Sequence, residues 1–127
     1  MARLALITRG DDAGSSMTAN RAIREACKEG ILRNVSVMVP CDALDDAADR
    51  LKDLDHVCFG LHATMNAEWS RVRWGAVSDH LPSLVLADGT FFQSVNALRD
   101  NQPRLDEAMV ELQAQLDKGR AAGFAFA

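Results

Sequence analysis

Two adjacent aspartates, Asp11 and Asp12, have the residue types and the spacing that chemistry at a cation requires. Neighbouring carboxylates repel each other, and their pairing is costly unless a positive charge lies beside them. A divalent cation is the usual partner, because one aspartate can bind it while the other acts as a base. The alternative is a solvated turn in which one aspartate caps the helix that follows.

His62 is a candidate for the same site because it directly follows a short apolar run, 57–61, which predicts a buried strand. Neutral imidazole is a frequent ligand of divalent metals, although a lone histidine is more often structural. If the strands are parallel, Asp11, Asp12 and His62 lie at the edge where the strands end, and α/β sheets bind their ligands there. We therefore favour a metal site over separate structural roles.

Polar and aromatic side chains near this edge are the candidates for substrate binding: Asn20, Glu68, Trp69, Arg73 and Trp74. Tryptophan faces often stack on sugar rings, and nearby polar groups then bind the hydroxyls. The alternatives are core packing for the two tryptophans and a solvated or capping role for Asn20.

The other histidines and the cysteines are given no role in catalysis. His56 precedes the third strand and is expected to be exposed at the opposite end of the sheet, and His80 lies in the long segment 63–101. The odd number of cysteines and their spacing argue against a disulfide framework and a cysteine zinc site. We expect buried small hydrophobic residues in a reducing compartment at Cys27, Cys41 and Cys58.

The elements that must position these residues alternate between strands and helices. Strands are predicted at 4–8, 31–39 and 57–61, with the opening of a fourth at 124–127. Helices are predicted after the N-cap candidates Ser15 and Ser16, after Asp42 as a cap, and after Pro103. This alternation implies an α/β fold with a parallel sheet and right-handed crossovers.

Two parts of the chain carry more specific predictions. The segment 63–101 lacks a periodic element, but its two tryptophans and two phenylalanines predict a packed, ordered excursion. The helix after Pro103 is predicted to bury an apolar stripe made of Leu105, Ala108, Met109, Leu112 and Leu116.

The composition is that of a single globular domain of 127 residues, with 48% hydrophobic and 25% charged residues. The net charge of −4 and the scattered lysines and arginines argue against nucleic acid as a partner. The apolar stretch near the N-terminus is too short for a signal peptide, and no run is long enough for a membrane span. We therefore expect a cytoplasmic protein without a membrane partner.

Several short motifs, taken in order, resemble those of the YdjC-like (ChbG) carbohydrate deacetylases. The motifs lie at 6–14, 19–23, 30–31, 35–39, 60–62, 66–69, 73–75, 82–84 and 88–89. Those from 66 onward are similar to an insertion found in one branch of the family. The resemblance covers essentially the whole chain, and it is the ordered set of motifs that is specific.

The resemblance implies a deformed, TIM-barrel-like (β/α) barrel of the NodB/glycoside hydrolase-deacetylase type. It also implies hydrolysis of the acetamide of an N-acetylated amino sugar, such as a chito-oligosaccharide. In the family a divalent metal, Mg or Zn, is held by one aspartate and two histidines. Asp12 and His62 match two of these ligands, and Asp11 matches the general base that takes a proton from the attacking water.

The chain departs from the family pattern at its C-terminal end. A Thr-His-x-Asp-x-His-like segment on the fourth strand has no match before Ala127, so the third ligand is missing. A complete barrel needs about 250 residues. We therefore expect one truncated domain, 1–127, that forms the first half of the barrel and has an insertion at about 63–101. Its open sheet edge predicts a homodimer or misfolding, and the missing ligand predicts little or no activity of the isolated chain.

Three alternatives to this deacetylase remain. An inactive fragment or binding scaffold would keep the fold without the reaction. A receiver-like signalling domain also has an acidic pair after its first strand, but it requires an aspartate where this chain has His62. A hydrolase acting on another amide would use the same metal site, and aspartate and histidine suit zinc, magnesium and several other ions.

Overall fold

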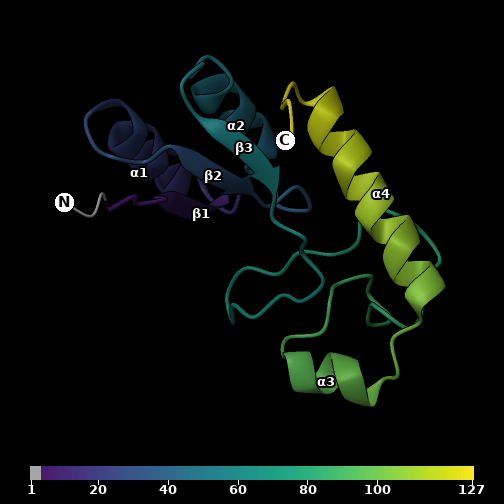
Figure 1. Ribbon diagram of the computed structural model, residues 1–127. Helices are drawn as coiled ribbons and strands as arrows, with labels where there is room; N and C mark the ends of the chain where they lie inside the picture. Colours follow the sequence, from purple (N-terminus) through teal and green to yellow (C-terminus); the bar gives the residue numbers. More distant parts are fainter. Residues whose placement is uncertain (1–3) are drawn as a thin grey trace.

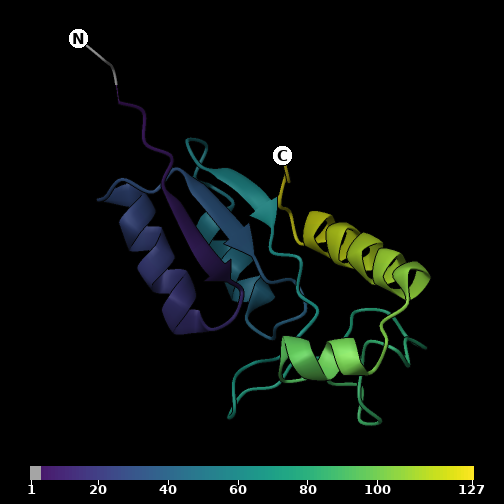
Figure 2. The same ribbon diagram turned by 60° about the horizontal axis from the view of Figure 1, so that its bottom comes forward.

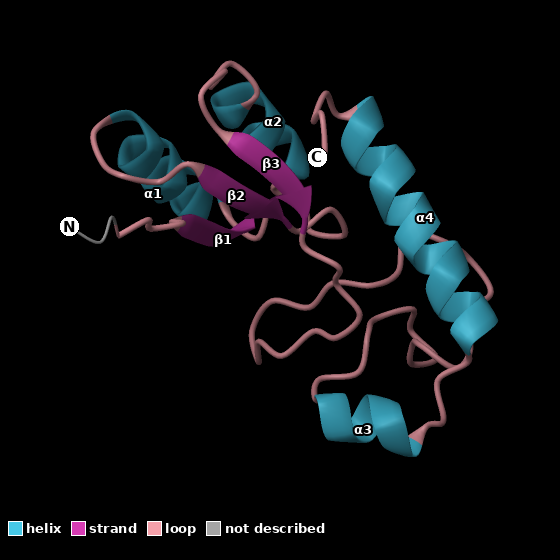
Figure 3. Ribbon diagram, in the orientation of Figure 1, coloured by secondary structure: helices cyan, strands magenta, loops and turns pink. Residues whose placement is uncertain are grey.

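The computed structural model describes residues 4–127, in which strands and helices alternate as predicted. In chain order the elements are β1 (Arg9–Ala13), α1 (Met17–Lys28), β2 (Asn34–Val37), α2 (Leu44–Leu51), β3 (Cys58–Leu61), α3 (Val95–Asp100) and α4 (Leu105–Ala121) (Figure 1; Figure 3). Of the helices in this part of the chain, none combines the length and the apolar character that crossing a membrane requires.

The three strands form one parallel sheet in the order β1-β2-β3, which confirms the predicted α/β fold. Helices α1 and α2 lie side by side on one face of this sheet (Figure 1; Figure 2). They bury an apolar core against it that includes Ile23, Val35, Val37, Leu51 and Phe59. Removal of this apolar surface from water, at roughly 25 cal/mol per Å², is the main force that holds the layers together.

The first strand begins at Arg9, so the prediction of a buried strand at 4–8 is wrong. The side chains before it are exposed to solvent, with exposed fractions of 101%, 79% and 85% for Leu4, Leu6 and Ile7. The reason lies in the partner strand, because β2 starts only at Asn34, whose backbone N–H donates to the Thr8 carbonyl. Residues 4–7 therefore have no strand beside them to pair with.

The two helices on the sheet differ in how they begin. Helix α1 has the predicted serine cap, since the Ser16 side chain accepts a hydrogen bond from the Ala19 N–H at 3.1 Å. The predicted cap Asp42 is wrong, because α2 starts at Leu44 and its first turn has no side-chain cap. A backbone turn in which the Leu44 N–H donates to the Cys41 carbonyl places the helix start one residue later than an Asp42 cap requires.

The segment 63–101 is packed, as its aromatic residues predicted. Trp74, Leu84 and Phe91 are buried in a second core cluster together with Met38 from the end of β2. Regular structure in this segment consists of α3 and two isolated β-bridges, Gly75–Thr90 and Val85–Phe91. Helix α3 escaped sequence reasoning because six residues are too few to show a helical period.

Helix α4 buries a face that only partly matches the predicted one. The predicted apolar stripe is wrong at Leu105 and Met109, which are 79% and 59% exposed, whereas Ala108, Leu112 and Leu116 are half-buried. The buried positions are Glu111, Gln115 and Gly119, which lie four residues apart on one side of the helix. The polar pair is buried because it binds backbone groups in the loops that precede the helix.

The last residues begin a fourth strand, as predicted. Phe126 forms a parallel bridge with Phe59, and the Ala127 N–H donates to the Phe59 carbonyl at 3.0 Å. The C-terminal end therefore lies beside β3 and continues the sheet on that side (Figure 1).

Candidate functional site

A β-bulge at the end of β1 determines where Asp11 and Asp12 point. The pairing of β1 with β2 shifts between Gly10 and Ala13, where β1 has one residue more than its partner. Asp12 takes a left-handed φ of 69° there, a conformation that aspartate tolerates better than most residues. Adjacent side chains of a regular strand point to opposite faces. The bulge removes this alternation, so both carboxylates can reach the same edge of the sheet.

His62 is the first residue after β3, and its backbone N–H donates to the Val37 carbonyl at 2.9 Å, which extends the strand pairing. Its Nδ1 atom lies 3.2 Å from Asp12 Oδ1 and 3.2 Å from Ser36 Oγ. The Ser36 hydroxyl donates to Asp11 Oδ1 at 2.6 Å. The structure thus brings Asp11, Asp12 and His62 together around one buried serine.

Sequence reasoning missed two residues of this cluster, Ser36 and Arg9. Ser36 is buried in β2, and Arg9 Nε lies 2.7 Å from Asp11 Oδ1. A signal for Ser36 was present, because Asn34 and Ser36 alternate with valines and therefore share the face opposite the core. Arg9 lies in β1, whereas the predicted first strand ends at Thr8. Only the observed start of β1 at Arg9 places its side chain on the same face of the strand as that of Asp11.

Hydrogen bonds hold the pKa of Asp11 below its ordinary value. The hydrogen bond from Ser36 is the largest cause, and the hydrogen bond and charge of Arg9 act in the same direction, while partial burial opposes them. The Asp11 carboxylate is therefore ionised near neutral pH and able to accept a proton.

A shallow pocket of about 130 Å³ opens at this cluster and is lined by Arg9, Asp11, Ser36, Leu61, His62 and Ala63. Ligand pockets usually have volumes of about 300 Å³ or more. The cluster in residues 4–127 therefore lies in an open surface hollow and not in an enclosed cleft.

Two of the larger hollows on the surface lie elsewhere. One, of about 620 Å³, contains the exposed His80 together with apolar residues of the long segment. The other, of about 360 Å³, lies between α1 and α2 and contains Arg21, Glu25 and Arg50. The smaller pocket is the better candidate for chemistry, because it alone among these three holds a carboxylate and an imidazole bridged by one hydroxyl.

Asp12 and His62 are spaced like two ligands of one divalent ion. Atoms that each lie about 2.1 Å from a metal are roughly 3 to 3.4 Å apart at ordinary ligand angles, and Asp12 Oδ1 and His62 Nδ1 are 3.2 Å apart. Within residues 4–127, no three His, Cys, Asp or Glu side chains are grouped so that they could hold a metal ion. With Nδ1 unprotonated, the two residues fit such an ion as part of a larger ligand set, and the Ser36 hydroxyl then bonds to Asp11 alone.

Asn20 lies inside the fold, with an exposed fraction of 0%. Its Oδ1 accepts from the Gly14 N–H at 2.7 Å, and its Nδ2 donates to the Ala43 carbonyl and to Asp46 Oδ2, both at 2.9 Å. Gly14 has a φ of 93°, and a Cβ there would lie 2.7 Å from the Met38 carbonyl oxygen, so only glycine fits. Asn20 holds this turn in place and keeps no free group for a substrate.

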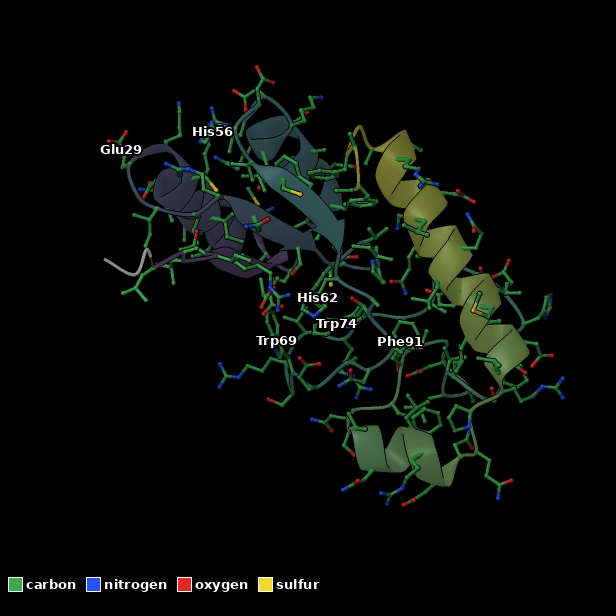
Figure 4. All side chains as sticks on the ribbon, in the orientation of Figure 1. Glu29, His56, His62, Trp69, Trp74 and Phe91 are labelled. Atoms are coloured by element: carbon green, nitrogen blue, oxygen red, sulfur yellow. The ribbon has the colours of Figure 1, made fainter. Side chains whose placement is uncertain are left out.

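The two tryptophans differ in exposure. Trp74 is buried, and its Nε1 donates to the Asn66 carbonyl at 2.8 Å. Its ring meets the half-buried Trp69 edge to face, with ring centroids 5.2 Å apart. Figure 4 shows the pair beyond the strand ends, at the same end of the sheet as His62. Trp69 therefore keeps part of its ring accessible, whereas Trp74 supports it from the core.

Glu68 and Arg73 flank the tryptophans. Glu68 is exposed, and its carboxylate accepts from Asn66 Nδ2 at 3.2 Å. Arg73 is half-buried and donates to the Phe91 carbonyl at 2.5 Å, while its Nε atom is buried without a hydrogen-bond partner. Glu68 is free to contact a ligand, whereas Arg73 braces the backbone at Phe91.

The remaining histidine and the cysteines lie apart from the cluster. His56 is exposed at the other end of β3, with Nε2 3.1 Å from the Cys27 carbonyl (Figure 4). Cys27 and Cys41 are buried as expected, and burial raises the pKa of Cys41 to about 12. Cys58 is exposed, so the prediction of burial is wrong for it. Since Phe59 faces the core, the preceding residue must face the uncovered side of the sheet.

Two proteins of similar sequence bear the name of a deacetylase. Each is about twice as long as the region that it shares with this chain. A carbohydrate deacetylase of Brevibacillus brevis is 30% identical over 118 residues, which cover 93% of this chain and 44% of that protein. A chitooligosaccharide deacetylase of Proteus mirabilis is 32% identical over 114 residues, which cover 89% and 42%. The chain thus spans less than half the length of these relatives.

A solved structure of similar fold comes from Enterococcus faecalis, from a protein assigned to cellobiose-phosphate cleavage. It superposes with a TM-score of 0.82 at 20% sequence identity, over 94% of this chain and 45% of that one. At this identity the likeness shows the fold alone. The sequence profile of the YdjC-like proteins, however, matches residues 5–127. The chain therefore belongs to the YdjC-like protein family.

Proposed function

We propose that this chain carries part of the active site of a metal-dependent hydrolase that removes acetyl groups from N-acetylated amino sugars, such as chito-oligosaccharides. The observation that carries the proposal is the grouping of Asp11, Asp12 and His62 around Ser36 at one end of the sheet. The names of two relatives, carbohydrate deacetylase and chitooligosaccharide deacetylase, support the reaction and the substrate class.

In this proposal Asp12 and His62 hold a divalent ion, Mg or Zn, which polarises the acetyl carbonyl and lowers the pKa of water when it is bound. Asp11 acts as the general base and accepts a proton from the water that adds to the acetyl carbon. Ser36 and Arg9 orient the Asp11 carboxylate and keep it ionised through their hydrogen bonds.

We assign sugar binding to the segment after His62. Trp69 offers the accessible part of its ring for stacking on a sugar, and Trp74 fixes its orientation by the edge-to-face contact. The exposed Glu68 carboxylate, next to this ring, is suited to accept hydrogen bonds from sugar hydroxyls.

The family resemblance implies one more histidine ligand, and residues 4–127 contain no group of three ligands. The matched regions cover 44% and 42% of the two relatives. We propose that polypeptide corresponding to the remainder of these relatives supplies the additional histidine and the opposite wall of the cleft.

A chimaera tests the chemistry. Residues 1–127 replace the matched 118-residue region of the Brevibacillus brevis carbohydrate deacetylase, and acetate release from di-N-acetylchitobiose is measured. We expect metal-dependent acetate release that falls at least about 100-fold on Asp11→Asn, because general base catalysis is worth that much. Asp49→Asn, an exposed aspartate of α2, is the matched control and is expected to have no effect. A chimaera that melts cooperatively but releases no acetate would favour the alternative of a scaffold without catalytic activity.

A further inference from the structure

Helix α4 carries a row of polar side chains that is buried against the loops leading from the site. Glu107, Glu111 and Gln115 lie four residues apart and share one face of the helix. Glu111 and Gln115 are 0% exposed. Buried polar groups are costly unless they are hydrogen-bonded, and each of these side chains is bonded to backbone groups of another segment.

Gln115 binds the segment directly after His62. Its Oε1 accepts from the Thr64 N–H at 3.1 Å, and its Nε2 donates to the Thr64 carbonyl at 2.7 Å. The side-chain amide of Gln115 thus accepts one hydrogen bond from the Thr64 backbone and donates another to it, as a residue of a neighbouring strand would. The Thr64 hydroxyl in turn donates to the His62 carbonyl at 2.7 Å. A side chain of α4 therefore fixes the backbone two residues beyond the histidine.

Glu111 and Glu107 bind the segment that contains the tryptophans. Glu111 accepts hydrogen bonds from three donors, the N–H groups of Val77 and Ser78, both at 3.0 Å, and Gln115 Nε2 at 2.7 Å. Glu107 accepts from the N–H and the hydroxyl of Ser83 at 2.9 and 2.8 Å. Because Gln115 and Glu111 are bonded to each other, one network joins the loop after His62 to the turn that follows Trp74.

We propose that α4 is a positioning helix for the site and that Gln115 is the positioning residue for His62. The proposal rests on the proposed metal-binding role of His62. The backbone of His62 is held by its hydrogen bond to the Val37 carbonyl in the sheet. After His62 the chain enters an irregular loop, in which the backbone N–H and carbonyl of Thr64 are both bonded to Gln115. Groups bonded directly to a metal-binding histidine contribute about 10- to 100-fold to metal affinity, and we expect Gln115, which acts through Thr64, at the lower end of this range.

Gln115→Met tests this role, because methionine fills the same space without hydrogen bonds. Gln113→Met is the matched control, since Gln113 is exposed on the same helix and donates to Asp117. All proteins are the full 127-residue chain with Cys58→Ser, so that the exposed thiol does not compete for zinc. Zinc affinity is measured by calorimetry, the His62 ring resonances by NMR, and folding by circular dichroism.

We expect Gln115→Met to fold, to weaken zinc binding about 10-fold and to shift the His62 ring resonances, whereas Gln113→Met changes neither. A folded Gln115→Met protein that matches Gln113→Met in both measurements overturns the proposal. If the parent chain binds no zinc, its two ligands do not suffice without the additional histidine, and the His62 resonances alone decide whether Gln115 positions the histidine.

If Gln115→Met does not fold, hydrogen exchange of the unmodified chain decides. The Thr64 amide donates to Gln115, and the amides of Val77 and Ser78 donate to Glu111, outside any helix or strand. Exchange much slower than in the exposed loop around Ser70 supports the network. Exchange of all three amides at the rate of that loop overturns it.

Discussion

Between β1 and β3, apolar side chains fill the space between the sheet and helices α1 and α2. Beyond His62, buried polar side chains of α4 bind the backbone of irregular loops instead. The first region has one such side chain, Asn20 at the turn after β1, and otherwise its strand ladders and helices satisfy their own backbone groups. In the second region, buried N–H and C=O groups lack regular partners, so single side chains must supply them. One region therefore depends on a repeating pattern and the other on individual hydrogen bonds.

The largest effect that we predict tests whether the two regions together suffice for catalysis. We expect residues 1–127 alone to release no measurable acetate from di-N-acetylchitobiose in the presence of Mg²⁺ or Zn²⁺. The reason is that Asp12 and His62 supply two ligands, whereas a catalytic zinc site usually has three from the protein. The Brevibacillus brevis relative serves as the positive control. Metal-dependent acetate release that disappears in Asp11→Asn would show that these two regions already form a complete site.

The next prediction concerns the region that depends on individual hydrogen bonds. Glu111→Ala leaves the N–H groups of Val77 and Ser78 and one donor of Gln115 without a partner. A buried unsatisfied donor costs about 1–3 kcal/mol, and because the Val77 and Ser78 amides are only part-buried, we expect the free energy of unfolding to fall by about 4 kcal/mol, near the lower end for three donors. Urea denaturation measures it, with the exposed Glu29→Ala as the control. A loss below about 1 kcal/mol would mean that water replaces the carboxylate and that the contrast between the regions is weak.

Sequence reasoning succeeded mainly in the region that depends on pattern. The cap at Ser16 and the third strand follow from local rules that compare neighbouring residues, and both are present in the structure. The grouping of Asp11, Asp12 and His62 could be anticipated because the ends of parallel strands share one edge of a sheet. Ser36 shared this edge and was overlooked, although its alternation with valines marked it.

Sequence reasoning failed where the partner of a side chain is set by tertiary structure. The helical period of α4 offers both an apolar and a polar face, and composition favours burial of the apolar one. Which face is buried was decided by Thr64 and Val77, whose backbone groups need Gln115 and Glu111. The strand predicted at 4–8 failed for a related reason, because its apolar residues have no neighbouring strand to pair with.

A core substitution in the first region provides the counterpart to Glu111→Ala. Leu51 is 0% exposed between α2 and the sheet, so Leu51→Ala removes apolar burial and leaves a cavity. We expect a loss of about 3 kcal/mol in the free energy of unfolding. Leu105→Ala, at a position wrongly predicted to be buried, should change it by less than about 0.5 kcal/mol. Equal losses for the two leucines would indicate that α4 also buries its apolar face in solution.

The smallest effect concerns the pKa of Asp11 and the hydrogen bond that its carboxylate accepts from the Ser36 hydroxyl. Hydrogen bonds, first of all the one from Ser36, lower the pKa of Asp11 in the folded protein. A lowered pKa means that folding favours the ionised carboxylate. The resulting stability is present above the unfolded pKa, about 3.9, and is lost as the pH falls through the folded value. Because the Asp11 side chain is 43% exposed, solvent weakens this contribution, and we expect only a slight change in acid stability.

Ser36→Ala should therefore raise the pKa of Asp11 toward its ordinary value, and a carbon-13 NMR titration of the Asp11 carboxyl measures it directly. Ser70→Ala, at an exposed position of the long segment, is the control and should leave the titration unchanged. Arg9 also binds Asp11. We therefore expect a partial rise of the Asp11 pKa in Ser36→Ala and a full rise only when both Ser36 and Arg9 are replaced. If the pKa does not move in Ser36→Ala, the arginine alone keeps the proposed base ionised. The buried serine would then serve packing between the strands and not the chemistry of the site.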